Sequence, residues 1–139
     1  MKNECDRFLV DANVLIYLAD RKDGPKHEKA MGLFSDSGKE QLFVSAQCIR
    51  EFANVCLSKR FISKEAIVGF VDSFTERFVV LQDDPLDTRN AVEMCGGNPN
   101  LFWDAAIVSM MKRNGIEKIF TENVSDFTSL GVKAINPLK

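Results

Sequence analysis

Four acidic residues in this sequence lie where carboxylate chemistry would be expected. Each either follows a predicted strand or occupies a predicted helix near its buried side; they are Asp11, Glu51, Asp104 and Asp126. Carboxylates packed together repel one another and retain protons unless a cation lies among them. Hard oxygen ligands without thiolate or imidazole suit Mg²⁺ or Mn²⁺ better than zinc. If the four side chains meet in space, the sequence predicts a divalent metal centre.

Asp104 gives the most informative signal of the four. In a predicted helix over 102–114, Ile107 and Met111 share its face, whereas Lys112 lies on the opposite side. Asp104 therefore belongs to the buried stripe, at the helix N-terminus. A buried carboxylate must be paired or metal-bound because an isolated buried charge is very costly. The alternative is an N-terminal acid that is stabilised by the helix dipole.

The other three acids have structural alternatives as well. Glu51 lies at the edge of an apolar arc, about 40° from Val55 at 100° per residue, and is too deep in its helix for the dipole to explain it. It could still belong to a solvated flank. Asp11 and Asn13 could cap a short helix, and Asp126 could cap the helical turn that follows it.

Short apolar runs alternate with longer helical patterns, which is typical of βα units around a parallel sheet. Predicted strands cover 8–10, 42–44, 78–81, 118–120 and 132–135, the last of them an edge strand. Predicted helices cover 13–20, 26–37, 45–59, 63–75, 85–95 and 102–114, with a helical turn at 125–130. The pattern predicts one domain over 1–139, an α/β three-layer sandwich with a central parallel sheet of four to five strands. Sites in such sheets form beyond the carboxyl ends of the strands, where the acids should converge.

The composition is that of an ordinary globular protein. Hydrophobic residues make up 45% and charged residues 27%, and the formal net charge is −2. No apolar run approaches the roughly 20 residues of a membrane helix, and the N-terminus offers no signal-peptide core, so we expect a cytoplasmic protein. With one histidine and four scattered cysteines, a structural zinc site is disfavoured and free thiols are expected.

Four segments resemble the successive motifs of PIN-domain proteins. They are VDANVLIY at 10–17, SAQCIREF at 45–52, FWDAAIV at 102–108 and TENVSDF at 121–127. The segment 131–138 is similar to the family's closing strand and tail. Four motifs in this order and at these spacings are specific, although each alone is weak. The chain length and the FWDA form look most like the VapC-type toxins of prokaryotic toxin–antitoxin pairs.

The resemblance implies a Mg²⁺- or Mn²⁺-dependent endoribonuclease that hydrolyses RNA phosphodiester bonds. It also implies a small antitoxin protein as partner and a homodimer. The acidic positions of the family match Asp11, Glu51, Asp104 and Asp126, which would bind metal and catalyse. Asn13, Thr121 and Asn123 would hydrogen-bond the ligands. Many relatives carry aspartate at the position of Asn123, so Asn123 or Glu122 could replace Asp126 as the fourth ligand.

Two other functions compete with this interpretation. A haloacid-dehalogenase-type phosphatase also begins with a strand followed by Asp-x-Asp, but here the second position is Asn13, which cannot act as an acid or base. A non-catalytic PIN-like module could bind RNA or a protein.

For an RNA ligand, the candidate phosphate contacts are Arg50, Lys59, Arg60 and Arg113, which could instead be parts of solvated helix faces. Apolar stripes of the helices at 26–37, 49–57 and 67–74 could form a groove for an antitoxin helix, or else pack the core.

Overall fold

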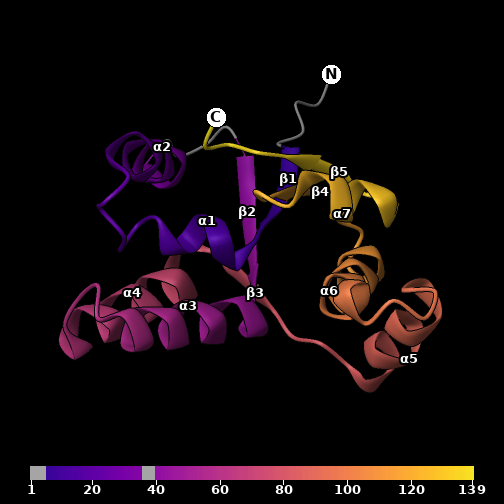
Figure 1. Cartoon of the computed structure of the whole chain (residues 1–139). Helices are drawn as coiled ribbons and strands as arrows, with labels where there is room; N and C mark the ends of the chain where they lie inside the picture. Colours follow the sequence, from indigo (N-terminus) through magenta and orange to yellow (C-terminus); the bar gives the residue numbers. More distant parts are fainter. Residues whose placement is uncertain (1–5, 36–39) are drawn as a thin grey trace.

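The centre of the molecule is a five-stranded, wholly parallel sheet (Figure 1). The computed structural model describes residues 6–35 and 40–139. The strands, in the spatial order β3-β2-β1-β4-β5, are β1 (Asp6–Val10), β2 (Glu40–Ser45), β3 (Val79–Leu81), β4 (Lys118–Phe120) and β5 (Lys133–Ile135). The predicted α/β fold with a parallel sheet is confirmed, with the last strand at one edge as expected.

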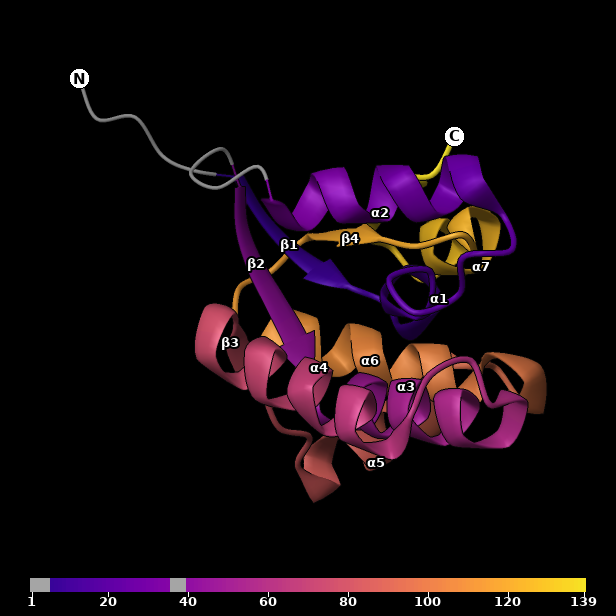
Figure 2. The same ribbon diagram turned by 90° about the vertical axis from the view of Figure 1, so that its left-hand side faces the viewer.

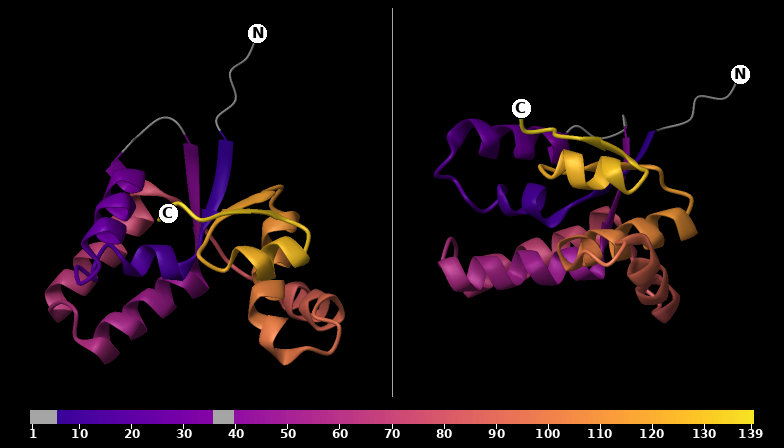
Figure 3. Two further views of the ribbon diagram at one scale, coloured as in Figure 1. Left: turned by 45° about the horizontal axis from the view of Figure 1, so that its top comes forward. Right: turned by 45° about the vertical axis from the view of Figure 1, so that its right-hand side comes forward.

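Helices cover both faces of the sheet and so form three layers. In Figure 2, α2 lies above the sheet, and α3 to α6 lie below it. The helices are α1 (Ala12–Ile16), α2 (Gly24–Ser35), α3 (Ala46–Lys59), α4 (Lys64–Arg77), α5 (Pro85–Met94), α6 (Phe102–Arg113) and α7 (Val124–Ser129), with a 3₁₀ turn at Pro99–Leu101. Figure 3 shows α3 and α4 on one flank of the molecule and α5 and α6 on the other.

Local sequence explains most helix ends. Ser45 caps α3 because its hydroxyl accepts the backbone N–H of Cys48 at 2.9 Å. Asp84 and Asp87 form a reciprocal capping box at the start of α5. Gly115 follows α6 with φ +71°, a conformation that strains other residues.

Two predicted helices have different bounds in the structure. The first was expected over 13–20, but α1 ends at Ile16 and residues 17–20 continue as irregular turns, held by bonds such as Asp20 N–H to Ile16 O at 2.9 Å. The second was expected over 26–37 and begins two residues earlier, at Gly24; the structure describes it as far as Ser35. Its predicted stop at Gly38 lies outside the described residues.

Apolar side chains on both faces of the sheet make the core. Leu9, Val44 and Ile119 of the three central strands are fully buried, as expected for a parallel sheet with helices on both sides. Below the sheet, Phe52 of α3 meets Phe74 of α4 edge to face, with ring centroids 5.1 Å apart. No helix within the described ranges is long and apolar enough to cross a membrane.

The strand order places a crevice at one point of the sheet. From β1 the chain proceeds outward to β2 and β3 on one side, whereas β4 and β5 lie on the other side of β1. The connections therefore leave β1 and β4 in opposite directions at their carboxyl ends. Such a switch point is where ligands bind in open parallel sheets.

Candidate active site

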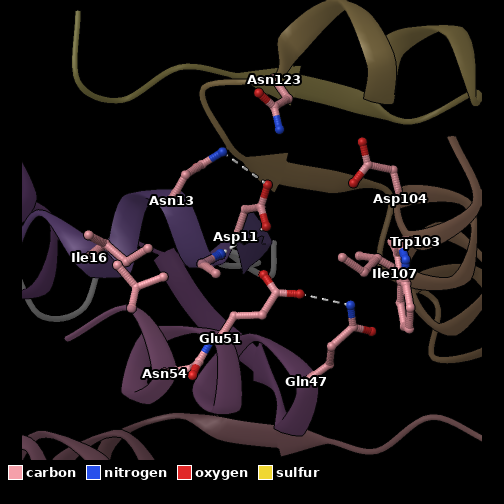
Figure 4. A pocket seen from close by; sticks show the side chains of 12 residues that line it. Asp11, Asn13, Ile16, Gln47, Glu51, Asn54, Trp103, Asp104, Ile107 and Asn123 are labelled. Carbon is pink, nitrogen blue, oxygen red and sulfur yellow. Dashed lines mark hydrogen bonds between the residues drawn. The ribbon is translucent and has the colours of Figure 1, made fainter. Parts of the chain in front are cut away.

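A pocket of about 270 Å³ lies at this crevice. Asp11 follows β1 at its floor, while Glu51 of α3 and Asp104 of α6 reach it from different sides (Figure 4). Asn123, which precedes α7, also lines the pocket. The structure thus brings three of the four predicted acids into one pocket. Its lining, as far as the structure describes it, includes no basic side chain.

Asp11 is fixed in place by four donors. Its Oδ1 accepts the backbone N–H of Ala12 at 2.8 Å and lies 3.9 Å from the thiol of Cys48. Its Oδ2 accepts the Thr121 hydroxyl at 2.8 Å and the Asn13 amide at 3.3 Å. Asp11 also caps α1, so the structural alternative from the sequence holds alongside the placement in the pocket. A carboxylate held in this way has little freedom to rotate away from a ligand.

Burial raises the pKa of Asp11, and Glu51 adds repulsion to it. The hydrogen bonds from Thr121 and Ala12 act in the opposite sense because they favour the charged form. Burial also raises the pKa of the neighbouring Cys48 thiol to about 12, so that it stays protonated and can donate to Asp11. Without a cation, the floor of the pocket therefore disfavours additional negative charge.

Asp104, like Asp11, is affected by burial and by nearby carboxyl groups, but it is less buried than Asp11. It is half-buried in the first turn of α6, where the buried stripe of that helix begins. Burial, followed by repulsion from Asp11, Asp126 and Glu51, raises the pKa of Asp104 to about 6. The repulsion shows that these four carboxyl groups share one electrostatic environment. A cation among them would reverse this shift.

Glu51 approaches the pocket from α3 as an exposed side chain. The amide of Gln47, one turn earlier on the same helix, donates to its carboxylate at 2.9 Å. This bond directs Glu51 along the helix face that lines the pocket, as Figure 4 shows. The exposed position agrees with the expected edge of the apolar arc.

The segment after β4 supplies the remaining predicted residues. Asp126 is exposed on α7 and close enough to raise the pKa of Asp104, but it is not among the lining residues. Asn123 lines the pocket in its place. Glu122 is engaged elsewhere, since its carboxylate lies 2.7 Å from Lys26 Nζ. Which of these residues completes a metal shell stays a prediction.

Thr121 and Asn13 link the segments that follow β1 and β4 across the crevice. The Thr121 hydroxyl donates to Asp11 and accepts the backbone N–H of Asn123 at 3.0 Å. The Asn13 amide donates to Asp11, and its carbonyl oxygen accepts the backbone N–H of Glu122 at 3.2 Å. Thr121 and Asn13 therefore fix the position of Asp11 relative to the loop that follows β4.

The donor set fits a hard divalent cation, although the side chains do not yet enclose one. The acids offer carboxylate oxygens, the ligands that Mg²⁺ and Mn²⁺ prefer. The described lining of the pocket contains no basic side chain that would compensate these carboxylates. As the side chains stand, no three acids, cysteines or histidines in the described ranges form a group that could hold a metal ion.

The sequence analysis did not single out Trp103, Gln47 or Asn54, which also line the pocket. Trp103 is the most notable because 63% of its surface is exposed at the pocket mouth. An exposed tryptophan beside a predicted catalytic aspartate was a visible signal, since tryptophan is usually largely buried.

Arg113, one of the four candidate phosphate contacts, belongs to a different site. Its guanidinium makes two bonds to Asp87, at 2.7 and 3.2 Å, and a third to the carbonyl oxygen of Gln82 at 3.0 Å. It lies at the C-terminal end of α6, whereas Asp104 lies at the N-terminal end. We therefore correct the sequence-based suggestion for Arg113, which is an internal ion-pair partner.

Comparison with known proteins adds one family and a set of similar folds. The family model described as PIN domain matches residues 8–131. No curated protein sequence matches the chain. Among solved structures, VapC20 of Mycobacterium tuberculosis, described as a Sarcin-Ricin loop cleaving toxin, is 18% identical with a TM-score of 0.71, covering 94% of this chain and 99% of that one.

Two further similar structures are toxin–antitoxin assemblies by their descriptions. A toxin-antitoxin complex from Klebsiella pneumoniae is 18% identical with a TM-score of 0.66, covering 94% of this chain and 97% of that chain. VapBC-1 from nontypeable Haemophilus influenzae is 17% identical with a TM-score of 0.65, covering 96% and 99%. At these identities the likeness demonstrates a shared fold over the whole length of each chain.

Proposed function

Because this chain belongs to the PIN-domain family, we propose that it is a Mg²⁺- or Mn²⁺-dependent endoribonuclease and the toxin of a toxin–antitoxin pair. The observation that carries the proposal is the convergence of Asp11, Glu51 and Asp104 in one pocket without a basic lining residue. Phosphodiester hydrolysis needs an activated water and neutralisation of phosphate charge, and an acid-lined pocket meets both needs through a divalent cation. The likeness to structures described as VapC20 and as toxin–antitoxin complexes supports the same class.

In this proposal Asp11 and Asp104 hold the cation directly, and Asp126 or Asn123 completes the set. Glu51 orients the attacking water or binds a second cation. A bound divalent cation supplies acidification of water and offsets charge on the phosphate. The chain itself positions the ligands of the cation, and hydrogen bonds from Thr121 and Asn13 hold Asp11 rigidly in place.

The other pocket residues position the RNA in this proposal. Gln47 keeps Glu51 on the pocket side of α3 through its 2.9 Å hydrogen bond. Trp103 presents an aromatic surface at the mouth, beside Asp104, where an unpaired base could stack. Stacking on Trp103 would hold a base next to the scissile phosphate. Water then attacks phosphorus, and the leaving oxygen takes a proton from solvent.

The direct test is RNA cleavage by the purified protein. We expect cleavage with Mg²⁺ or Mn²⁺ and none with EDTA. Asp104→Asn should lower the rate on the order of a thousandfold, because it removes a ligand worth several kcal/mol to the transition state. Asp72→Asn, which changes an exposed acid on α4, is the matched control and should cleave normally.

Two results would count against the proposal. Full activity of Asp104→Asn would place the active site elsewhere. Absence of cleavage, together with no Mn²⁺ binding by calorimetry, would favour the non-catalytic PIN-like module that binds RNA or protein.

An antitoxin partner is the second part of the proposal. An apolar groove of about 130 Å³ lies between α2 and α4, lined by Met31, Phe34, Phe70 and Phe74 among others. Met31 is 47% exposed there although it is apolar. An amphipathic helix laid in such a groove would bury these side chains. The groove involves two of the three segments that the sequence suggested, 26–37 and 67–74.

Met31→Glu tests this groove with the protein encoded by the adjacent reading frame. We expect the variant to cleave RNA normally but to need about tenfold more of that protein for inhibition, since a charge would enter an apolar contact. Unchanged inhibition would exclude the groove between α2 and α4.

A homodimer is the remaining part of the proposal. Leu86 and Val92 of α5 are large apolar side chains that are 47% and 60% exposed. We propose α5 as the dimer interface because it carries two of the exposed large apolar side chains, which a second copy of the chain would cover. Light scattering of the purified protein, with and without Val92→Lys, measures whether the chain pairs through α5.

A further inference from the structure

A second cleft of about 680 Å³ lies at the far end of α1 and α3. The turns after α1 form one wall, and the end of α3 with the loop to α4 forms the other; both are at the same end of the molecule in Figures 1 and 2. Four of its eight lining residues are basic: Arg21, Lys22, Lys59 and Arg60. This concentration of positive charge occurs in a chain with more acidic than basic residues.

The basic side chains of the cleft are available to a ligand. All four residues are exposed, and none forms an ion pair with another residue of the described ranges. Asp20 is the single acid in the lining, and its carboxylate accepts the backbone N–H of Lys22 at 3.0 Å. Four cations against one carboxylate leave a strong positive potential, which favours a polyanion.

The cleft lies along the same pair of helices as the acid pocket. Ile16 of α1 and Val55 of α3 line the acid pocket, and Ala19 and Lys59 line the basic cleft. Glu51 and Lys59 are eight residues apart on α3, about 12 Å along the helix axis. That separation corresponds to roughly three or four nucleotides of a stacked strand at 3.4 Å each.

We propose that this basic cleft binds backbone phosphates of single-stranded RNA, three or four nucleotides from the phosphate at the acid pocket. The inference rests on the proposed ribonuclease function and adds the direction in which the substrate strand runs, along α1 and α3. A cation cluster away from the acids is physically reasonable, because lysine or arginine in the pocket would compete with the metal for carboxylates. The cleft supplies affinity, and the pocket supplies the chemistry.

The test compares two doubly substituted proteins of equal charge. Arg21→Gln with Lys59→Gln removes two cations from the cleft. Lys29→Gln with Lys133→Gln removes two exposed cations from α2 and β5, outside the cleft. Lys22 and Arg60 are left unchanged, so that two of the four cations of the cleft remain in this variant. Binding of labelled oligoribonucleotides of two and eight nucleotides is measured by anisotropy in EDTA, where metal-dependent cleavage does not occur.

We expect the cleft variant to bind the eight-nucleotide RNA about tenfold more weakly, with the slope of log K against log salt reduced by about 0.7 per lost phosphate contact. The two-nucleotide RNA carries a single phosphodiester and contacts few of the cations at once, so we expect its binding to be weak in all three proteins and to change little. The control variant should match the wild type for both lengths. Polyglutamate serves as the acidic-polypeptide probe, and we expect its binding to be weak and equal in all three proteins.

Equal binding of the eight-nucleotide RNA by both variants would overturn the proposal, as would a loss confined to polyglutamate. Failure of the ribonuclease proposal is a separate result. A protein that cleaves no RNA with Mg²⁺ or Mn²⁺, but whose RNA binding depends on Arg21 and Lys59, would retain the cleft as an RNA site without catalysis.

Discussion

Two acidic sites near opposite ends of α6 differ in how their negative charge is compensated. At the C-terminal end, Asp87 is 1% exposed and lies 2.7 Å from the Arg113 guanidinium. The hydroxyl of Ser109 also donates to Asp87 at 2.8 Å. At the N-terminal end, Asp104 faces Asp11 across a pocket that has no basic lining residue among those described. One site is neutralised by the chain, and the other is not.

The pKa shifts express this difference. Burial alone would raise the pKa of Asp87, but the bonds from Arg113 and Ser109, with the backbone N–H of Asp84, hold it below its ordinary value. The pKa of Asp104 is raised to about 6 by burial and by its acidic neighbours. Buried charge that the fold leaves uncompensated is characteristic of functional sites. The comparison indicates that Asp87 stabilises the fold, and it supports the proposal that Asp104 binds a cation.

The largest expected effect on stability follows removal of the internal cation. Arg113→Met should destabilise the protein more than Asp87→Asn does, because it leaves the buried carboxylate of Asp87 without its cationic partner. Urea denaturation at pH 7 measures the change. Arg89→Met is the control, since Arg89 and Glu93 form an exposed pair 3.1 Å apart, and its loss should cost less than about 0.5 kcal/mol. Similar losses for both variants would mean that Asp87 does not depend on Arg113.

A smaller effect is expected for Asp87→Asn, about 2 kcal/mol at pH 7, because hydrogen bonds to a charged acceptor become neutral ones. The folded-state pKa of Asp87 is lowered, so its contribution is fully present above the ordinary value of 3.8 and disappears as pH falls through the folded-state value. The difference in unfolding free energy between wild type and variant should shrink below pH 4. A difference that stays constant to pH 2 would contradict the assignment.

The smallest expected effect has the opposite sign. Asp104→Asn in EDTA at pH 7 should stabilise the protein by on the order of 1 kcal/mol, because repulsion is removed from a half-exposed group that solvent partly screens. The folded-state pKa is raised to about 6, so ionisation costs stability as pH rises from about 4 to 6. The gain should therefore be absent below pH 4 and complete above pH 7.

Mn²⁺ provides the control for this variant. Added Mn²⁺ should raise the melting temperature of the wild type and of Asp72→Asn but not that of Asp104→Asn, because a ligand stabilises only the state that binds it. If Asp104→Asn destabilises the protein in EDTA, the acid pocket and the Asp87 site are alike and the contrast between them is wrong.

Much of the molecule follows from local sequence. Short apolar runs predict all five strands, and longer helical patterns predict six of the seven helices, with the seventh as a helical turn. The cap at Ser45 and the end of α6 before Gly115 follow in the same way. The position of Asp104 on the buried side of its helix was also readable, since it depends only on the residues three and four positions away.

Long-range contacts decided the rest, because they depend on which segments the fold places side by side. Nothing near Arg113 in sequence indicates that it pairs with Asp87, 26 residues earlier. The short α1, the placement of Asn123 rather than Asp126 in the pocket lining and the basic cleft that joins residues 21–22 to 59–60 likewise depend on tertiary packing. The sequence determined which residues could carry charge into the interior, and the tertiary structure decided which of those charges were neutralised.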